Sequence, residues 1–241
     1  MLACFDALRE LNTVSILFRL ALAMLFGGLI GLERGRKRRA AGFRTYMLVS
    51  LGAALTMLLG QYNFLMLETD WAALAAELGV KTDVSRFGAQ VINGIGFLGA
   101  GTIIVTGKQQ VKGLTTAAGL WASACMGLAI GAGFYECVLM VFLLILFSMQ
   151  VLPAVEAAMV ARARNMNLYI EFTSLDDIGR IIGRVKAQGA HIYEVEIDHG
   201  KEKKHRNPNA VLTIRLDEKL PHTQVLAAIS ELETVRTIQE I

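Results

Sequence analysis

The fold is decided by residues 13–39, which read TVSILFRLALAMLFGGLIGLERGRKRR. Residues 13–32 form an apolar run long enough for a helix to cross a hydrocarbon core of about 30 Å, and Arg19 is its single charge. Five Lys or Arg follow within the next seven residues. Because short loops rich in Lys and Arg stay on the cytoplasmic side, this stretch predicts a transmembrane helix that ends in the cytoplasm.

We expect four further membrane spans from apolar stretches of similar length, at residues 43–61, 84–105, 113–133 and 135–155. The segment 67–79 has apolar positions at helical spacing, but it carries three acidic residues and is too short to span. It is predicted to lie on the membrane surface as an amphipathic helix. The expected fold class is therefore an α-helical transmembrane bundle of about five spans, followed by a different kind of domain.

Composition places the boundary between the two parts. Hydrophobic residues make up 54% of the 241 residues and charged residues 19%, against roughly 45–50% and about 25% in soluble domains. Residues 1–164 hold 14 Lys or Arg and 9 Asp or Glu, whereas residues 165–241 hold 10 and 12. Disordered, collagen-like and disulfide-rich classes are excluded. We expect a membrane domain at 1–160 and a soluble domain at 166–241, with the N-terminus outside and the soluble domain in the cytoplasm.

The last 75 residues alternate between strand and helix patterns. Strands are predicted at 167–173, 190–198, 211–216 and 234–241, and helices at 176–188 and 221–232. The order βαββαβ is that of the ferredoxin-like unit, which includes the ligand-binding ACT family. Two roles fit such a tail, a small-molecule sensor and a docking or dimerisation module, and fold alone does not choose between them.

Small residues recur at helical spacing in the membrane part. Close packing of helices in lipid uses such residues, so we expect packing at Gly27 and Gly31 and at Gly127 and Gly131. The stretch 94–101 is denser still, with glycines at Gly94, Gly96, Gly99 and Gly101. Each weakens a helix by about 1 kcal/mol relative to Ala. A bend or break is therefore expected there, of the kind that holds ion or substrate sites in transporters.

Polar residues inside the spans are candidates for a functional site. Arg86, Gln90 and Asn93 share one helical face, and this face indicates either hydrogen bonding between helices or a functional polar site. Arg19 lies about 10 Å inside the first span. Its position fits either a functional charge or a side chain that snorkels to the surface.

Charged and hydroxyl residues also gather at the predicted cytoplasmic helix ends. Glu33 and Arg34 end the first span and Arg44 and Thr45 begin the second, so a Glu33–Arg44 ion pair is a natural hypothesis. The basic run 36–39 is expected to set topology and to contact lipid headgroups rather than nucleic acid. Two threonines and a lysine open the fourth span, and we expect the threonines to cap the helix rather than to receive an anion there: Lys112, Thr115 and Thr116.

No motif indicates an enzyme, a cofactor or a metal site. The three cysteines and four histidines have no metal-ligand or catalytic spacing. Mg²⁺ prefers carboxylate and water oxygens, yet the middle of each predicted span lacks an acid. This pattern counts against a cation path through the bundle.

Four motifs occur in order: GGLIGLER at 27–34, AGFRTYMLV at 41–49, NGIGFLGAG at 93–101 and KGLTTAAGLW at 112–121. Together they resemble the MgtC/SapB family, and the tail resembles the ACT-like C-terminal domain of its longer members. The resemblance implies a bacterial inner-membrane protein linked to growth at low magnesium and, in pathogens, to survival in host phagocytes. It assigns functional weight to Glu33, Arg34, Arg44, Arg86, Asn93 and the motif glycines.

Two functions follow from the resemblance and the residues together. The first is a regulator that acts through membrane partners, including the F-type ATP synthase, with a tail that senses a ligand or forms a homodimer. The second is a transporter or channel for Mg²⁺ or another ion, which would use the glycine-rich segment and the polar face beside it.

Overall fold

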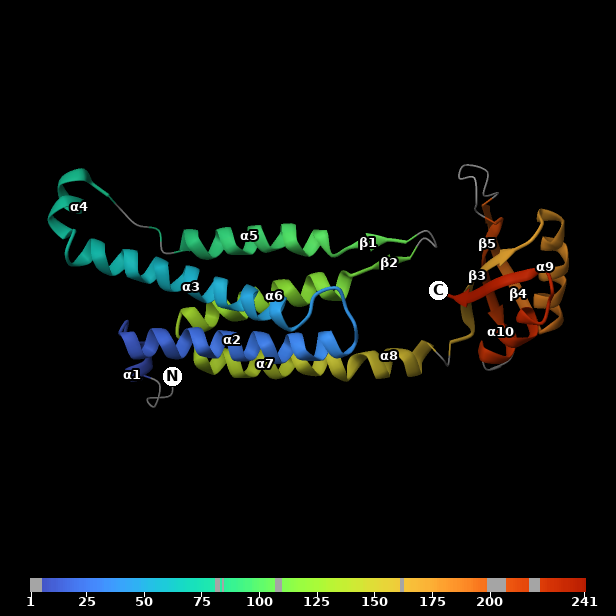
Figure 1. The fold of residues 1–241 in the computed structure, drawn as a ribbon, viewed down its shortest axis with the longest axis horizontal. Coiled ribbons are helices and arrows are strands. Elements are labelled where there is room, and N and C mark those ends of the chain that lie inside the picture. Colours follow the sequence, from blue (N-terminus) through green and yellow to red (C-terminus); the bar gives the residue numbers. More distant parts are fainter. Residues whose placement is uncertain are drawn as a thin grey trace. The chain divides into compact units, whose positions relative to one another are not determined.

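The computed structural model describes residues 6–80, 83, 85–106, 110–160, 163–198, 207–216 and 222–241. It divides into two compact units, Met1–Val151 and Leu152–Ile241 (Figure 1). The division falls nine residues before the predicted end of the membrane domain at 160. The difference arises because residues 152–160 form a separate helix that follows the last helix of the first unit.

The first unit is helical, and its long helices run side by side (Figure 1). In chain order its elements are α1 (Asp6–Arg9), α2 (Thr13–Arg36), α3 (Phe43–Glu68), α4 (Ala72–Leu78), α5 (Ser85–Gly101), β1 (Ile104–Val105), β2 (Val111–Lys112), α6 (Leu114–Gly131) and α7 (Tyr135–Gln150). Helix α3 is central, since both α2 and α6 pack extensively against it. The hairpin β1–β2 joins α5 to α6 at the end of the unit where α2 joins α3 (Figure 1); we call this the loop end.

Among the described residues, four helices are long and apolar enough to cross a membrane: α2, α3, α6 and the continuous stretch Tyr135–Val160, which joins α7 to α8 (Leu152–Val160). Helix α5 has 17 residues and is shorter than these four. The predicted surface segment 67–79 begins in the last turn of α3 and continues as α4, none of whose residues is buried.

Local sequence explains where the long helices begin and end. The Asn12 side chain caps α2 by accepting a hydrogen bond from the Ser15 amide, and the Asn12 amide in turn donates to Ser15 Oγ. Helix α6 begins after Gly113, whose φ of +100° suits glycine. A Cβ on Gly113 would also overlap the carbonyl oxygen of Thr102, so this turn into α6 requires glycine on two counts.

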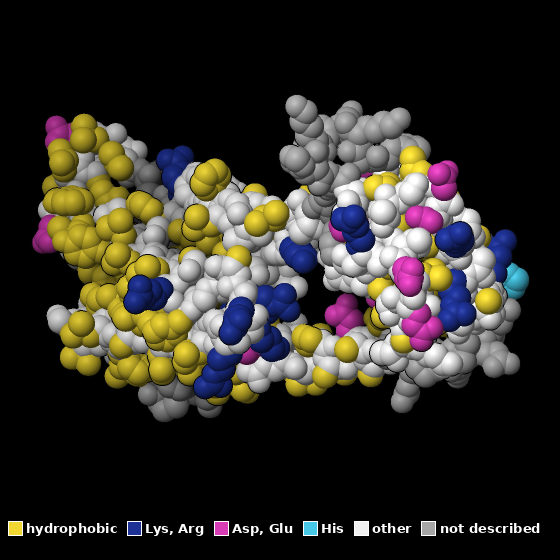
Figure 2. Space-filling model, turned by 45° about the vertical axis from the view of Figure 1, so that its right-hand side comes forward, with side chains coloured by type: hydrophobic (Ala, Val, Ile, Leu, Met, Phe, Trp, Pro, Cys, Tyr) yellow, Lys and Arg dark blue, Asp and Glu magenta, His cyan; other side chains and the backbone are white. Residues whose placement is uncertain are grey.

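Many apolar side chains lie on the face of the helical unit that Figure 2 shows. Exposed large side chains lie on every long helix, for example Leu17 on α2, Leu48 on α3, Phe97 on α5, Trp121 on α6 and Leu144 on α7. A soluble domain would bury many of these side chains, whereas a lipid environment accommodates them. The exposed apolar surface therefore agrees with the membrane location that helix length indicates.

The second unit contains a four-stranded antiparallel sheet with strand order β4-β5-β3-β6. Its elements after α8 are β3 (Asn165–Phe172), η2 (Leu175–Asp177), α9 (Ile178–Ala187), β4 (Ala190–Asp198), β5 (Asn209–Leu216), α10 (His222–Ser230) and β6 (Val235–Glu240). Alternate residues of β3 and β5, such as Leu168 and Leu212, form one core with Ile181 of α9 and Val225 of α10. The element order is the expected βαββαβ, with both helices packed into the same core.

Candidate functional site

Two glycines let α2 lie directly on α3. A Cβ added to Gly27 would stand 2.7 Å from the Ser50 side chain, and one added to Gly31 would stand 2.8 Å from Phe43 Cα. Both distances are too short for any side chain, so α2 approaches the α3 backbone only because these residues lack one. The contact carries the last turn of α2, with Glu33 and Arg34, to the start of α3.

The glycines of α6 also lie directly against α3. A Cβ on Gly127 would overlap the Ser50 carbonyl oxygen, and one on Gly131 would stand 2.5 Å from the Ala54 carbonyl oxygen. The predicted pairs of small residues on α2 and α6 thus both face α3. By holding the two helices against α3, they bring Thr116 of α6 next to Arg34 of α2.

Arg34 is the centre of a buried polar cluster at the loop end. Its side chain is buried, and its Nη2 donates to Thr116 Oγ1 at 3.3 Å. Tyr46 of α3, which is completely buried, donates its hydroxyl to the Thr116 carbonyl oxygen at 3.3 Å. Arg34 Nε has no hydrogen-bond partner among the described residues. A buried guanidinium with an unused donor is unfavourable by itself.

Glu33 and Lys37 supply the remaining charges of this cluster. Glu33 Oε1 lies 2.6 Å from Lys37 Nζ, and Glu33 Oε2 lies 4.0 Å from Arg34 Nη1. Lys37 also donates to the Met149 carbonyl oxygen at 3.1 Å, which ties the end of α2 to the end of α7. Four elements of the helical unit therefore meet at Arg34 and its neighbours: α2, α3, α6 and α7.

The structure corrects two expectations for this region. The Glu33–Arg44 ion pair is replaced by the Glu33–Lys37 pair, because Lys37 follows one turn later on the same helix while Arg44 is exposed, as is Thr45. Threonine capping of α6 is also replaced: the N-cap is Gly113, and it makes no side-chain cap bond. Thr116 lies in the first turn and faces Arg34, whereas Thr115 and Lys112 are exposed.

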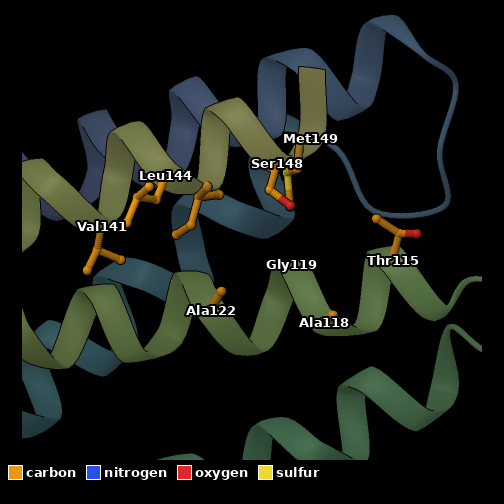
Figure 3. Close-up of a pocket in the computed structure, with 9 residues that line it drawn as sticks. Thr115, Ala118, Gly119, Ala122, Val141, Leu144, Ser148 and Met149 are labelled. Carbon is orange, nitrogen blue, oxygen red and sulfur yellow. The ribbon is translucent and has the colours of Figure 1, made fainter. Parts of the chain in front are cut away.

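A groove between α6 and α7 borders the cluster (Figure 3). It has a volume of about 310 Å³ and is mostly apolar; Thr115, Ala118 and Ala122 line it from α6, and Leu144 and Ser148 from α7. Gly119 forms its inner wall, since a Cβ there would stand 2.5 Å from both Tyr46 Oη and Met149 Cε. A side chain at position 119 would therefore collide with the Tyr46 hydroxyl.

A second polar cluster, at the other end of the bundle, surrounds Arg19. Arg19 is completely buried, so it does not snorkel to the surface. All five of its N–H groups donate at 2.8–3.1 Å to the Tyr135 hydroxyl, the Gln61 side chain and the carbonyl oxygens of Gly131, Leu8 and Arg9. These acceptors come from α1, α3, α6 and α7. A fully satisfied guanidinium of this kind fastens helix ends together and leaves no donor for a ligand.

Neighbouring groups add charge to the Arg19 cluster. Arg9 forms an ion pair with Glu136 and another with Asp6. The hydrogen bond with Glu136 raises the pKa of Arg9. Sequence reasoning found Arg19 but missed Gln61 and Tyr135, whose polar groups at predicted span ends were the available signal.

Helix α5 carries the third polar region. Arg86, Gln90 and Asn93 are all exposed, at helical spacing along one face. The expected bend at 94–101 is absent from the described residues, because α5 is a continuous helix from Ser85 to Gly101. It packs on α6 at Gly99, where an added Cβ would lie 3.5 Å from Ala117 Cβ.

The four other glycines of α5, Gly88, Gly94, Gly96 and Gly101, have no close neighbour among the described residues. No atom of another described element lies within 4 Å of a Cβ placed on Gly94, Gly96 or Gly101. Phe97, on the same side as the polar residues, is 83% exposed. The face of α5 formed by Arg86, Gln90, Asn93, Gly94, Phe97 and Gly101 is therefore open, and we call it the α5 open face.

No group of three or more His, Cys, Asp or Glu that could hold a metal ion occurs among the described residues. Within that part of the chain, the acids near the polar clusters already have basic neighbours, as Glu33 does with Lys37 and Glu136 with Arg9.

Long apolar helices with buried polar clusters at both ends, followed by an α+β unit, define an integral membrane protein with an appended globular domain. Comparison with known proteins identifies the family. The MgtC family matches residues 20–158, more than half of the chain. The chain therefore belongs to the MgtC family, as its four sequence motifs indicated.

Named relatives cover different lengths. Escherichia coli (strain K12) has the "putative magnesium transporter YhiD", 42% identical over 125 residues, which are 52% of this chain and 54% of that protein. The chain thus spans about half the length of that relative. Protein SapB of Bacillus subtilis (strain 168) is 29% identical over 226 residues, 91% of this chain and 92% of SapB. Protein MgtC of Brucella abortus (strain 2308) is 42% identical over 114 residues, 47% of this chain and 41% of MgtC.

Proposed function

We propose that this chain is a regulator in the bacterial inner membrane that helps the cell adapt to scarce magnesium by binding another integral membrane protein. Membership of the MgtC family supports the link to magnesium. The observation that carries the binding role is the α5 open face, with its exposed polar side chains and unpacked glycines.

The chemistry of this face favours protein over lipid as its neighbour. The amides of Gln90 and Asn93 would lie about 7 and 12 Å along a helix that begins at Ser85. Unpaired amides are unfavourable in hydrocarbon, and intramembrane polar residues usually face protein or water. Gly94 and Gly101 would let a second helix approach the α5 backbone closely. A transmembrane helix of a partner satisfies both requirements.

The proposal includes α5 as a fifth membrane span. Its 17 residues extend about 25 Å, close to the hydrocarbon thickness, and it lies beside α6 in the bundle (Figure 1). Five spans, with the basic α2–α3 loop inside, place the N-terminus outside and the C-terminal unit in the cytoplasm. The C-terminal unit would then act as an ACT-like sensor or a dimerisation module, and we propose no catalytic activity for the chain.

A photo-crosslinking experiment tests the binding role. A benzophenone amino acid replaces Phe97 on the α5 open face, and in a matched control it replaces Leu144 on α7, which is also exposed, at 65%. Cells grown at low magnesium are irradiated and adducts are identified by mass spectrometry. We expect protein adducts from position 97, with subunits of the F-type ATP synthase as the first candidates, and mainly lipid adducts from position 144.

The same experiment can also contradict the binding role of the α5 open face. If positions 97 and 144 give the same adducts, the α5 open face meets only lipid and the binding role fails. Replacing Asn93 with Leu should remove the adducts from position 97 and impair growth at low magnesium. The corresponding control, Met140→Leu on the exposed surface of α7, should change neither.

Magnesium transport is the second candidate, favoured by the name of the E. coli relative. Purified protein in liposomes loaded with a magnesium-sensitive dye separates the two candidates. Magnesium uptake that Asn93→Ala abolishes would support transport, whereas no uptake together with position-97 adducts would support the regulator.

A further inference from the structure

The crevice between α2 and α7 at the loop end combines apolar and basic walls. Its lining consists of Leu29, Leu32, Glu33, Arg36, Lys37 and Gln150, and its volume is about 470 Å³. Leu29 and Leu32 are partly exposed on the sides of α2. Arg36 follows on the same helix, about 10 Å beyond Leu29. An amphiphile that lies along α2 would meet the leucines with its chain and the basic residues with its head.

The charges of the crevice are not balanced internally. Glu33 Oε1 forms an ion pair with Lys37 Nζ at 2.6 Å, and Lys37 also donates a hydrogen bond to the Met149 carbonyl oxygen. The buried Arg34 adds a second cation 4.0 Å from Glu33. Arg36 has no acidic partner within 4 Å among the described residues. Among the described residues that line this crevice, Arg36 is thus a cation without an acidic partner, and the net charge of the lining is positive.

We propose that this crevice binds the headgroup of an anionic phospholipid. The phosphate would lie against Arg36 and the Gln150 amide, and the first part of an acyl chain would lie along Leu29 and Leu32. Basic pockets between transmembrane helices on the cytoplasmic side are known to select anionic headgroups. A soluble phosphate ion would use the basic wall alone and leave the apolar wall unused. This inference concerns a different surface from the α5 open face and stands without the proposed partner.

The test measures which lipid stays with the full-length protein. The purified chain is incorporated in nanodiscs that contain equal amounts of phosphatidylglycerol and phosphatidylcholine, and retained lipids are counted by native mass spectrometry. We expect phosphatidylglycerol to be enriched in the wild type. Arg36→Gln should lower the enrichment about fivefold, whereas Arg36→Lys should keep most of it.

A matched control separates a bound lipid from general attraction to the basic loop. Arg39→Gln removes the same charge from the same loop but does not line the crevice, and it should leave the enrichment unchanged. Equal losses in Arg36→Gln and Arg39→Gln, or equal retention of both lipids by the wild type, would overturn the proposal. Displacement of phosphatidylglycerol by millimolar inorganic phosphate would also overturn it, in favour of a site for a free anion.

Discussion

At the scale of single residues, Arg19 and Arg34 differ in how far their donors are used. Arg19 uses all five N–H groups, and three of its five acceptors, on Gln61, Gly131 and Tyr135, lie on the distant helices α3, α6 and α7. Arg34 has one side-chain bond, to Thr116, and a buried Nε without a partner among the described residues. The first arrangement suits a permanent structural tie and the second suits a site that changes its contacts.

Replacing Arg19 should therefore reduce stability sharply. Lysine keeps the charge but has three donors on one atom, so Arg19→Lys leaves acceptors such as the Gly131 carbonyl oxygen unsatisfied. We expect a loss of about 2 kcal/mol or more, measured as a lower midpoint of thermal unfolding in detergent. Arg44→Lys, at an exposed position, should leave the midpoint unchanged. An equal effect of both changes would contradict the structural role.

The two adjacent threonines of α6 allow a closely matched comparison. Thr116→Val keeps the shape of the side chain but removes the oxygen that accepts from Arg34, which leaves one more buried donor unpaired. We expect a destabilisation of about 1–3 kcal/mol. Thr115→Val, whose side chain is exposed, should have little effect. If the two variants unfold at the same temperature, Thr116 has no role in holding Arg34.

At the scale of elements, the glycines fall into two groups that sequence spacing does not distinguish. Gly127 contacts the backbone of α3, whereas Gly94 on α5 has no atom of another described element within 4 Å of a Cβ placed there. Gly127→Ala should destabilise the purified protein, since a Cβ would overlap the Ser50 carbonyl oxygen. Gly94→Ala should be neutral or stabilising by up to about 1 kcal/mol, through helix propensity. Unfolding midpoints in detergent compare the two, and equal destabilisation would show that α5 packs on both sides within this chain.

Helices were predictable from the sequence because hydrophobic length and small-residue spacing are local signals. The packing of Gly27 and Gly131 follows from such signals. The partners of Arg34 and Arg19 do not, since Thr116 lies 82 residues from Arg34 and Tyr135 lies 116 residues from Arg19. Proximity in sequence also led to a wrong prediction, because Arg44 follows Glu33 across the loop but is exposed, while Lys37 forms the ion pair. Polar contacts between distant helices depend on which faces meet, and only the packed bundle decides that.

At the scale of the whole molecule, α5 decides on which side of the membrane the C-terminal unit lies. In the proposed topology, the basic residues within 33–39 keep the α2–α3 connection inside in either case. If α5 crosses the membrane, α6 starts inside and the stretch Tyr135–Val160 returns the chain to the cytoplasm. If α5 lies on the outer surface, α6 starts outside and the C-terminal unit is exported. The antiparallel packing of α5 against α6 (Figure 1) favours the first arrangement.

Single cysteines, introduced into a variant that lacks Cys4, Cys125 and Cys137, measure on which side of the membrane each segment lies. In intact spheroplasts, a membrane-impermeant maleimide should label Trp71→Cys, beside the exposed α4, but neither Arg38→Cys nor Arg215→Cys until the membrane is permeabilised. Arg38 serves as the internal reference, because the loop it belongs to is inside under both arrangements. Labelling of Arg215→Cys in intact spheroplasts would show that α5 does not cross. The α5 open face would then meet water instead of a partner helix, and the binding role proposed for it would fail together with the fifth span.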